Sequence, residues 1–288
     1  MVSKRIDYGI TKEWLSRKYI QEQLNQRELA EMVGCSRKVI RSRLDEWGIQ
    51  RRANSQSLKI SHSKRDSHWK HKLDERCFAL ESMTEQSYYF LGYIFADGCL
   101  EESHWSLSAS SIDREVLDGL GRLLKWTGEP YACKPTRFTK HQLYKVNIYS
   151  KQIYHNLLDW GLCPNKSDKM VFPDLSCEAL PHFVRGYFDG DGYIGVYGRY
   201  TFPVHISFVS NSREFLESLR KRVEICAGIS LPKVAVMSNG RAWNIQASCG
   251  SAMTFCNWMY AYPGPRLKRK YEKYLSACPA KPMRIVLQ

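Results

Sequence analysis

The sequence lacks the features that mark several common classes of protein. It has no uninterrupted apolar stretch of the roughly eighteen residues that a transmembrane helix needs. No apolar run follows residues 1–5, so a secretory signal is not expected either. The ten cysteines include no C-x-x-C pair, which excludes the ligand spacing of a zinc ribbon. We therefore expect a soluble, cytoplasmic protein whose cysteines are reduced and mostly fill the core.

Acidic residues are scarce relative to basic ones. The chain has 29 Asp and Glu against 43 Lys and Arg, which gives a formal net charge of +14. An excess of this size indicates a polyanionic partner, most often nucleic acid, with a membrane surface as the rival. The 288 residues, 43% hydrophobic and 25% charged, are otherwise typical of a globular protein with one large unit and a small one.

Residues 1–52 have the pattern of three short helices. Asn25 can cap the second helix, which stops at Gly34, and Ser36 can cap the third. Helix, short turn with glycine and helix are typical of a helix-turn-helix domain that binds DNA. The alternative is a plain three-helix bundle with a solvated basic face. The side chains expected to contact DNA from this part are Arg37, Lys38, Arg41, Arg51 and Arg52.

Residues 53–77 predict a basic linker or arm. Over residues 50–76 there are eight Lys and Arg against three Asp and Glu, with little apolar periodicity. Such a segment cannot form a core of its own, so it is either flexible or ordered on a partner. Contact with phosphates and a merely solvated tether both fit this composition.

A segment that ends in Asp-Gly occurs twice in the rest of the chain. Residues 90–98 and 184–192 each read as an apolar helix, and their acids, Asp97 and Asp191, are 94 residues apart. In both segments a glycine stands five residues before the aspartate, a tyrosine follows that glycine, and a small residue precedes the acid. We expect the two segments to lie together at the centre of the protein.

Other landmarks repeat in the same order. Residues 107–117 match residues 206–216 at an offset of 99, residues 146–148 match 243–245 at 97, and residues 159–160 match 257–258 at 98. One unit is therefore present twice, over residues 78–175 and 176–288. Apolar periodicity within each unit predicts the order αββαββα. The expected fold is α+β, with two pseudo-symmetric repeats whose antiparallel sheets form a saddle-like surface for DNA.

Alternation within the expected strands gives each sheet an apolar and a polar face. The polar face would be rich in Ser, Asn, Gln, Tyr and Lys, and such a face can hydrogen-bond base edges in the major groove. An ordinary solvated sheet face fits the alternation equally well, and only the charge and the acids favour DNA. The side chains expected to contact DNA from this part are Ser106, Ser108, Arg137, Lys145, Asn147, Tyr149, Arg199, His205, Ser207, Lys233, Arg241, Asn244 and Gln246.

Small residues spaced four apart indicate how the two apolar helices pack. Gly92 with Ala96, and Gly186 with Gly190, lie on one face of each helix, where two backbones can approach closely. Packing there puts the two aspartates side by side at helix C-termini, which is unfavourable unless a cation bridges them or one is protonated. Hard oxygen ligands with few other protein ligands suit Mg²⁺, and a metal between carboxylates and a phosphate supports hydrolysis. An Asp-Gly turn is the alternative for either copy alone.

The two segments resemble the LAGLIDADG motifs of homing endonucleases, in their single-chain form with two motifs. The resemblance covers roughly Phe78 to Leu275 and extends to residues 161–167 and 269–275. It implies a monomer with internal pseudo-twofold symmetry that cleaves both strands of a specific DNA site across the minor groove. It also implies Mg²⁺ shared between Asp97 and Asp191, with Mn²⁺ or Ca²⁺ as substitutes in binding.

The resemblance assigns further roles to residues near the acids. The backbone carbonyls of Ala96 and Gly190 would complete the metal shell. A lysine would stand near each centre, with Lys166 and Lys268 as the candidates by position and Lys270 in reserve. The first motif departs from the family at Phe95, where an aspartate can stand, but this position belongs to the packing face and both metal-binding acids are retained.

An intein, a DNA-binding regulator and an RNA maturase are the alternatives to a homing endonuclease. An intein is not expected, because the chain begins with Met1, lacks Cys or Ser at the splice position and ends at Gln288 without His-Asn. An intron-encoded or free-standing enzyme fits better. The rivals are a DNA-binding regulator of the same fold that does not cut, and a maturase that binds its host intron RNA.

Overall fold

The computed structural model describes residues 8–53, 56, 71–135, 141–166, 169–197, 203–238 and 240–278. The chain forms two units, residues 1–71 and 72–288. In its described residues the first unit is helical. Its elements are α1 (Lys12–Ser16), a π-helical turn η1 (Arg17–Gln21), α2 (Gln26–Met32) and α3 (Arg37–Glu46).

The first unit has local start signals and a core of its own. Asn25 and Glu28 form a reciprocal capping box at the start of α2, and Ser36 is the residue before α3. The buried side chains of this core are Leu15, Tyr19, Leu29, Ala30, Ile40, Leu44 and Ile49. Since this cluster contains no residue of the second unit, the helices of the first unit are stabilised by one another.

The second unit contains the expected duplicated order. Its first repeat consists of α5 (Glu85–Asp97), β1 (Gly98–Glu101), β2 (Ser106–Ser111), α6 (Arg114–Leu123), β3 (Tyr131–Ala132), β4 (Tyr144–Tyr149) and α7 (Lys151–Asp159), with 3₁₀ turns η3 (Leu80–Ser82) and η4 (Glu102–His104). Its second repeat consists of α8 (Leu180–Asp191), β5 (Gly192–Val196), β6 (Val204–Ser210), α9 (Arg213–Ala227), β7 (Ala235–Val236), β8 (Trp243–Ser248) and α10 (Cys249–Tyr260), and continues into α11 (Lys268–Ala277). The αββαββα prediction is confirmed for both repeats, and α11 is an addition to it.

Each repeat builds one antiparallel sheet, with matching strand orders β1-β2-β4-β3 and β5-β6-β8-β7. Leu107 pairs with Ile148 in the first sheet, and Ile206 pairs with Ala247 in the second. The offset is therefore 99 residues in both strands, and the sequence match at 97 for the last strand was wrong by two residues. A shift of two leaves every side chain on its own face of a strand, so alternation alone could not detect the error.

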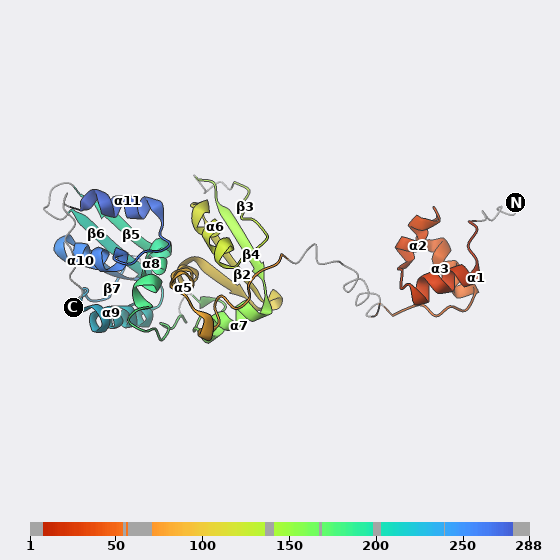
Figure 1. The fold of residues 1–288 in the computed structure, drawn as a ribbon, viewed down its shortest axis with the longest axis horizontal. Helices are drawn as coiled ribbons and strands as arrows, with labels where there is room; N and C mark the ends of the chain where they lie inside the picture. The colour runs from red at the N-terminus through yellow and green to blue at the C-terminus, as the bar shows by residue number, and fades with distance from the viewer. Residues whose placement is uncertain are drawn as a thin grey trace. The chain divides into compact units, whose positions relative to one another are not determined.

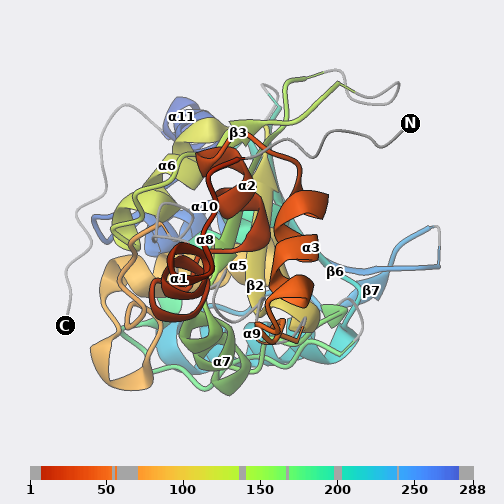
Figure 2. The ribbon, with the colours of Figure 1, turned by 90° about the vertical axis from the view of Figure 1, so that its right-hand side faces the viewer.

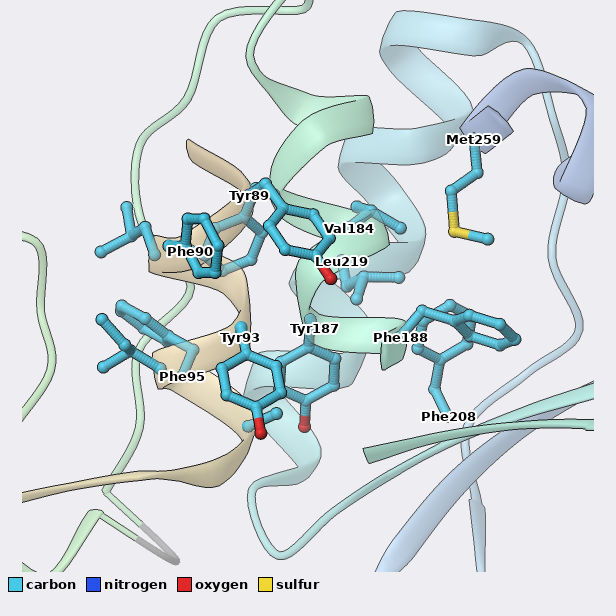
Figure 3. Close-up of a cluster of buried hydrophobic side chains, with 14 of the residues drawn as sticks. Tyr89, Phe90, Tyr93, Phe95, Val184, Tyr187, Phe188, Phe208, Leu219 and Met259 are labelled. Carbon is cyan, nitrogen blue, oxygen red and sulfur yellow. The ribbon is translucent and has the colours of Figure 1, made fainter. Parts of the chain in front are cut away.

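Helices α5 and α8 pack against each other at the centre of the second unit, between the two sheets (Figure 1; Figure 2). A Cβ added to Gly92 would lie 2.0 Å from the carbonyl oxygen of Phe183, and one added to Gly186 would lie 1.8 Å from that of Tyr89. Only glycine permits such backbone contact, so the predicted role of the small residues is confirmed. Figure 3 shows the aromatic side chains that extend from this contact into the core, and Phe95 among them is fully buried.

The predicted state of the cysteines was wrong for one pair. Cys177, just before α8, and Cys226, near the end of α9, form a disulfide with a Cα–Cα distance of 5.2 Å. Their separation of 49 residues hides this proximity, which the fold of the second repeat creates. Cys77 and Cys256 are buried in the core as expected, whereas Cys99 and Cys249 are exposed. In the described parts of the chain, no helix has the length and apolar character of a membrane span.

Candidate functional site

The C-terminal ends of α5 and α8 meet at the small residues that precede the two acids. A Cβ added to Gly190 would lie 2.3 Å from the Cβ of Ala96 and 3.3 Å from Oδ2 of Asp97. The Asp97 carboxylate therefore lies against the backbone of α8 one residue before Asp191. The fold brings together the two aspartates that were expected to be neighbours.

The two carboxylates share a negative and partly desolvated environment. Both Asp97 and Asp191 are exposed to solvent, although neighbouring groups desolvate part of each carboxylate. Partial burial raises the pKa of Asp97, although nearby Tyr93 and Lys166 oppose the shift. Burial and the charge of Asp97 raise the pKa of Asp191 to about 6. Since helix C-termini are also negative, a cation between the acids would stabilise the charged form of both carboxylates.

Lys166 lies beside the end of α5. Its ammonium group donates to the carbonyl oxygens of Ile94 at 2.8 Å, Phe95 at 2.5 Å and Ala96 at 2.7 Å. Ile94 O also accepts from the backbone N–H of Gly98, and the lysine adds a bond to each of the three carbonyls before Asp97, so it serves as a C-terminal cap. Burial lowers the pKa of Lys166 to about 8, while the two aspartates oppose the shift. The residue therefore lies where the resemblance placed it.

Lys270, rather than Lys268, occupies the equivalent position at the end of α8. Its ammonium group donates to the carbonyl oxygens of Phe188 at 2.6 Å and Asp189 at 2.9 Å, and burial lowers its pKa to about 8. Lys268 is exposed, with its ammonium group 3.9 Å from Glu272. Two residues along a helix turn a side chain by about 200°, so only one of the two lysines can face α8. The geometry therefore favours Lys270 over Lys268 as the lysine of the second centre.

The carbonyl groups expected to join the metal shell also accept hydrogen bonds from the lysines. Ala96 O accepts from Lys166, and Gly190 O accepts from Lys270 at 3.5 Å. The two carboxylates are the charged donors for a metal, and each of these carbonyl oxygens keeps a second lone pair. No cluster of three or more His, Cys, Asp or Glu side chains occurs within the described ranges. Two carboxylates open to solvent on one side fit Mg²⁺, which retains waters and accepts phosphate oxygens as ligands.

A buried arginine on α8 was missed from the sequence. Arg185 is fully buried, and its guanidinium donates to the carbonyl oxygens of Met259 at 3.1 Å, Tyr262 at 2.9 Å and Pro265 at 2.9 Å. It thereby fixes the path of the chain from α10 toward α11. A charged residue on the apolar face of the second motif was the only signal, since the first motif has Leu91 there.

Asp189 continues this buried polar network. Its carboxylate accepts from the Tyr89 hydroxyl and from the backbone N–H of Leu267, both at 2.7 Å, and burial raises its pKa to about 6. Leu267 is the residue before α11, so the contact sets where α11 begins and where Lys270 points. The first repeat has Phe95 at the equivalent position, and its ring packs edge-on against Phe183 of α8.

The open face of the first sheet is polar but mostly neutral. Ser108 pairs with Asn147, whose amide donates to the Tyr131 hydroxyl at 2.9 Å. Tyr149 is exposed and Lys145 is half-buried. Ser106, which was expected to contact DNA, is buried. Over the described residues, which leave out 136–140, the face is therefore less basic than the sequence suggested.

The second sheet presents an imidazole and several polar side chains. Nδ1 of His205 lies 2.7 Å from the Ser248 hydroxyl, and Gln246 is exposed opposite Ser207. Asn244 is only 9% exposed, and the register makes Gln246, rather than Asn244, the counterpart of Asn147. The expected contacts at the ends of this sheet are exposed for Lys233 and Arg241. Arg137 and Arg199 lie outside the described residues.

The five basic residues of the first unit that were expected to contact DNA differ in their surroundings. Lys38 and Arg41 are exposed on α3. Arg51 pairs with Asp45 at 2.9 Å. Arg52 instead stabilises the unit, because its guanidinium stacks on the Tyr19 ring and donates to carbonyl oxygens there. Arg37 is exposed but bonds to Gln26 at 3.3 Å.

Comparison with known proteins gives one family match and several structural likenesses. A model of a LAGLIDADG-like domain matches residues 178–229. The homing endonuclease I-WcaI, bound to its DNA recognition sequence, is 13% identical over 78% of this chain and 95% of that one, with a TM-score of 0.48. I-DmoI in complex with DNA and Ca is 11% identical over 65% of this chain and 96% of that one, with a TM-score of 0.47.

A further likeness is to full-length DUF199/WhiA from Thermatoga maritima. It is 16% identical over 70% of this chain, with a TM-score of 0.46, and this chain spans 63% of its length. No curated protein matches the sequence. The family match runs from just before α8 through α9, and over this part the chain resembles a LAGLIDADG-like domain.

Proposed function

We propose that the protein is a site-specific, Mg²⁺-dependent homing endonuclease that makes a double-strand break in DNA by phosphodiester hydrolysis. The observation that carries this proposal is the meeting of Asp97 and Asp191 at the ends of α5 and α8, where half-buried Lys166 caps one helix end and buried Lys270 caps the other. Two acids and two lysines in a pseudo-symmetric arrangement suit two strands of opposite polarity. The formal charge of +14 supports a nucleic-acid partner.

The two aspartates would hold the metal, which supplies a polarised phosphate and an activated water when bound. Lys166 and Lys270 balance the charge of the carboxylates, because their ammonium groups interact with both acids. They also place fixed positive charge beside the site where a scissile phosphate gains negative charge, which stabilises the transition state. Bonds to helix carbonyls hold both ammonium groups in place before substrate arrives.

Polar side chains on the two sheets would recognise the target sequence. Asn147, Tyr149, His205 and Gln246 have hydrogen-bonding groups on the open faces, and amide side chains suit adenine edges in the major groove. We propose that the first unit adds a helix-turn-helix contact through α3, where Lys38 and Arg41 are exposed. One chain supplies both repeats, so a monomer suffices.

The second candidate is a DNA-binding regulator that keeps the fold without cutting. The helical first unit favours it, since α2, a short turn and α3 with exposed basic residues suit DNA contact in a regulator equally well. An RNA maturase is a third use of the same surfaces. The three functions differ in which nucleic acid is bound and in whether Mg²⁺ causes a break.

One experiment separates these functions. Duplexes that bind the full chain in Ca²⁺ would be selected from a randomised pool and then exposed to Mg²⁺. An endonuclease binds a defined sequence in Ca²⁺ and cuts it at a fixed position in Mg²⁺. Specific binding without any break would identify a regulator, and binding of structured RNA without selection of a duplex would identify a maturase. Asp118→Asn, a change in an exposed ion pair of α6, serves as a matched control for loss of an acid.

A further inference from the structure

Two tyrosines occupy equivalent places in the two motif helices. Tyr93 and Tyr187 each follow a contact glycine and stand four residues before Asp97 and Asp191, which puts each tyrosine on the same helix face as its acid. Both are buried, with 1% and 0% of their surface exposed. Figure 3 shows the two rings side by side, with both hydroxyl groups pointing the same way.

The two hydroxyl groups differ in their partners. The Tyr187 hydroxyl donates to the carbonyl oxygen of Val209 in β6 at 2.9 Å. The Tyr93 hydroxyl is buried and, among the described residues, makes no hydrogen bond of acceptable geometry. Buried polar groups are nearly always paired, because an unpaired one loses its bonds to water without replacement. A phenylalanine would fill the same space without this cost.

The surroundings of Tyr93 indicate what its hydroxyl is for. Its hydroxyl interacts with Asp97 and Ser111: burial above all, and then the charge of Asp97, raise the pKa of Tyr93 well above its usual value. The Ser111 hydroxyl already accepts from the backbone N–H of Asp113 at 3.1 Å. The Tyr93 hydroxyl thus lies near the Asp97 carboxylate, and its proton is available for donation to that carboxylate.

We propose that Tyr93 is a positioning residue for Asp97, whose carboxylate it holds by a hydrogen bond when that carboxylate binds the metal. Asp191 has no such support, because Tyr187 is committed to Val209. The two halves of the site are therefore unequal, and the DNA strand served by Asp97 depends on Tyr93. A hydrogen bond to a ligand carboxylate fixes its orientation and strengthens metal binding. This inference rests on the proposed metal site at the two aspartates.

The matched pair Tyr93→Phe and Tyr187→Phe tests the inference in the full chain. The melting temperature and the affinity for Mn²⁺ alone, measured by calorimetric titration, are the two readouts. Tyr93→Phe should weaken Mn²⁺ binding about tenfold, in the range of lost ligand-supporting bonds, while the melting temperature stays constant or rises. Tyr187→Phe should lower the melting temperature by several degrees, since it leaves a carbonyl unpaired, and leave Mn²⁺ affinity unchanged.

Strand-resolved cleavage of a selected duplex gives a second readout. Tyr93→Phe should slow one strand more than the other, so that nicked duplex accumulates, and Tyr187→Phe should not. Equal Mn²⁺ affinity of Tyr93→Phe and the unaltered chain would overturn the inference, as would a loss of stability matching that of Tyr187→Phe. If the unaltered chain binds no Mn²⁺ that Asp97→Asn removes, the metal site itself is wrong and the proposed function fails with it.

Discussion

The Asp97 carboxylate touches the backbone of α8 at Gly190, with Oδ2 3.3 Å from the point where a Cβ would stand. This contact places the acid of one repeat beside the acid of the other. It depends on small residues along the whole crossing, because Gly92 and Gly186 let the backbones of α5 and α8 meet. The position of the site and the stability of the second unit are therefore linked.

Gly92→Ala should destabilise the second unit by about 3 kcal/mol or more, since the new Cβ would lie 2.0 Å from a backbone oxygen that cannot move alone. Chemical denaturation followed by far-UV circular dichroism measures this change. Gly250→Ala is the matched control: it lies in α10 with no atom within 4 Å of the new Cβ. It should be neutral or stabilise by up to about 1 kcal/mol. Equal effects of the two changes would contradict the packing described for α5 and α8.

The thermal stabilisation caused by Mg²⁺ should depend on pH. Asp191 has its pKa raised to about 6, so below pH 6 the folded protein holds a proton that the metal must displace. The increase in melting temperature on adding Mg²⁺ should be small at pH 5 and full at pH 7.5. Without metal the sign is opposite: the raised pKa makes the folded state lose stability as pH rises from about 4 through 6. A Mg²⁺ effect equal at both pH values would contradict this assignment.

Lys270→Gln should reduce the rate of cleavage by about 10² to 10³, because one preorganised charge beside the scissile phosphate is lost. Lys268→Gln removes the same charge from an exposed side chain two residues earlier and should change the rate by less than about threefold, since surface ion pairs contribute little. Single-turnover kinetics on a selected duplex gives both rates. Interchanged effects would return the assignment to Lys268.

Replacing both Lys38 and Arg41 by glutamine should weaken DNA binding and flatten its dependence on salt. Each lost phosphate contact should reduce the slope of log affinity against log salt by about 0.9. Titration of a labelled duplex at several salt concentrations measures the slope. Arg27→Gln, which alters an exposed ion pair on α2, is the control. An unchanged slope in the double variant would exclude α3 from contact with DNA.

Much of the fold could be predicted because its signals are local. Glycine spacing and an acid after an apolar run are visible within a few residues, and comparison of the two halves of the chain shows that their order repeats. These signals all describe the crossing of α5 and α8. The choice between Lys268 and Lys270 could not be predicted, because it depends on where α11 begins. That point is set by the bond from Leu267 to Asp189, 78 residues away.

The other errors also come from contacts between distant residues. Alternation in β8 is the same at offsets of 97 and 99, so only the pairing of β6 with β8 shows that Gln246, rather than Asn244, is the counterpart of Asn147. Arg52 has the charge of a DNA contact, yet the Tyr19 ring and nearby carbonyls hold it inside the first unit. Composition shows that these groups are present, and packing decides which of them face a partner.

We propose above all that Asp97 and Asp191 form one metal-dependent site that breaks both strands of DNA. The most direct test is cleavage of a duplex selected in Ca²⁺ by the variants Asp97→Asn and Asp191→Asn, with Asp118→Asn as control. Each of the first two should bind the duplex with nearly unchanged affinity and make no double-strand break in Mg²⁺, while the control cuts normally. Undiminished double-strand cleavage by both single variants would contradict the account.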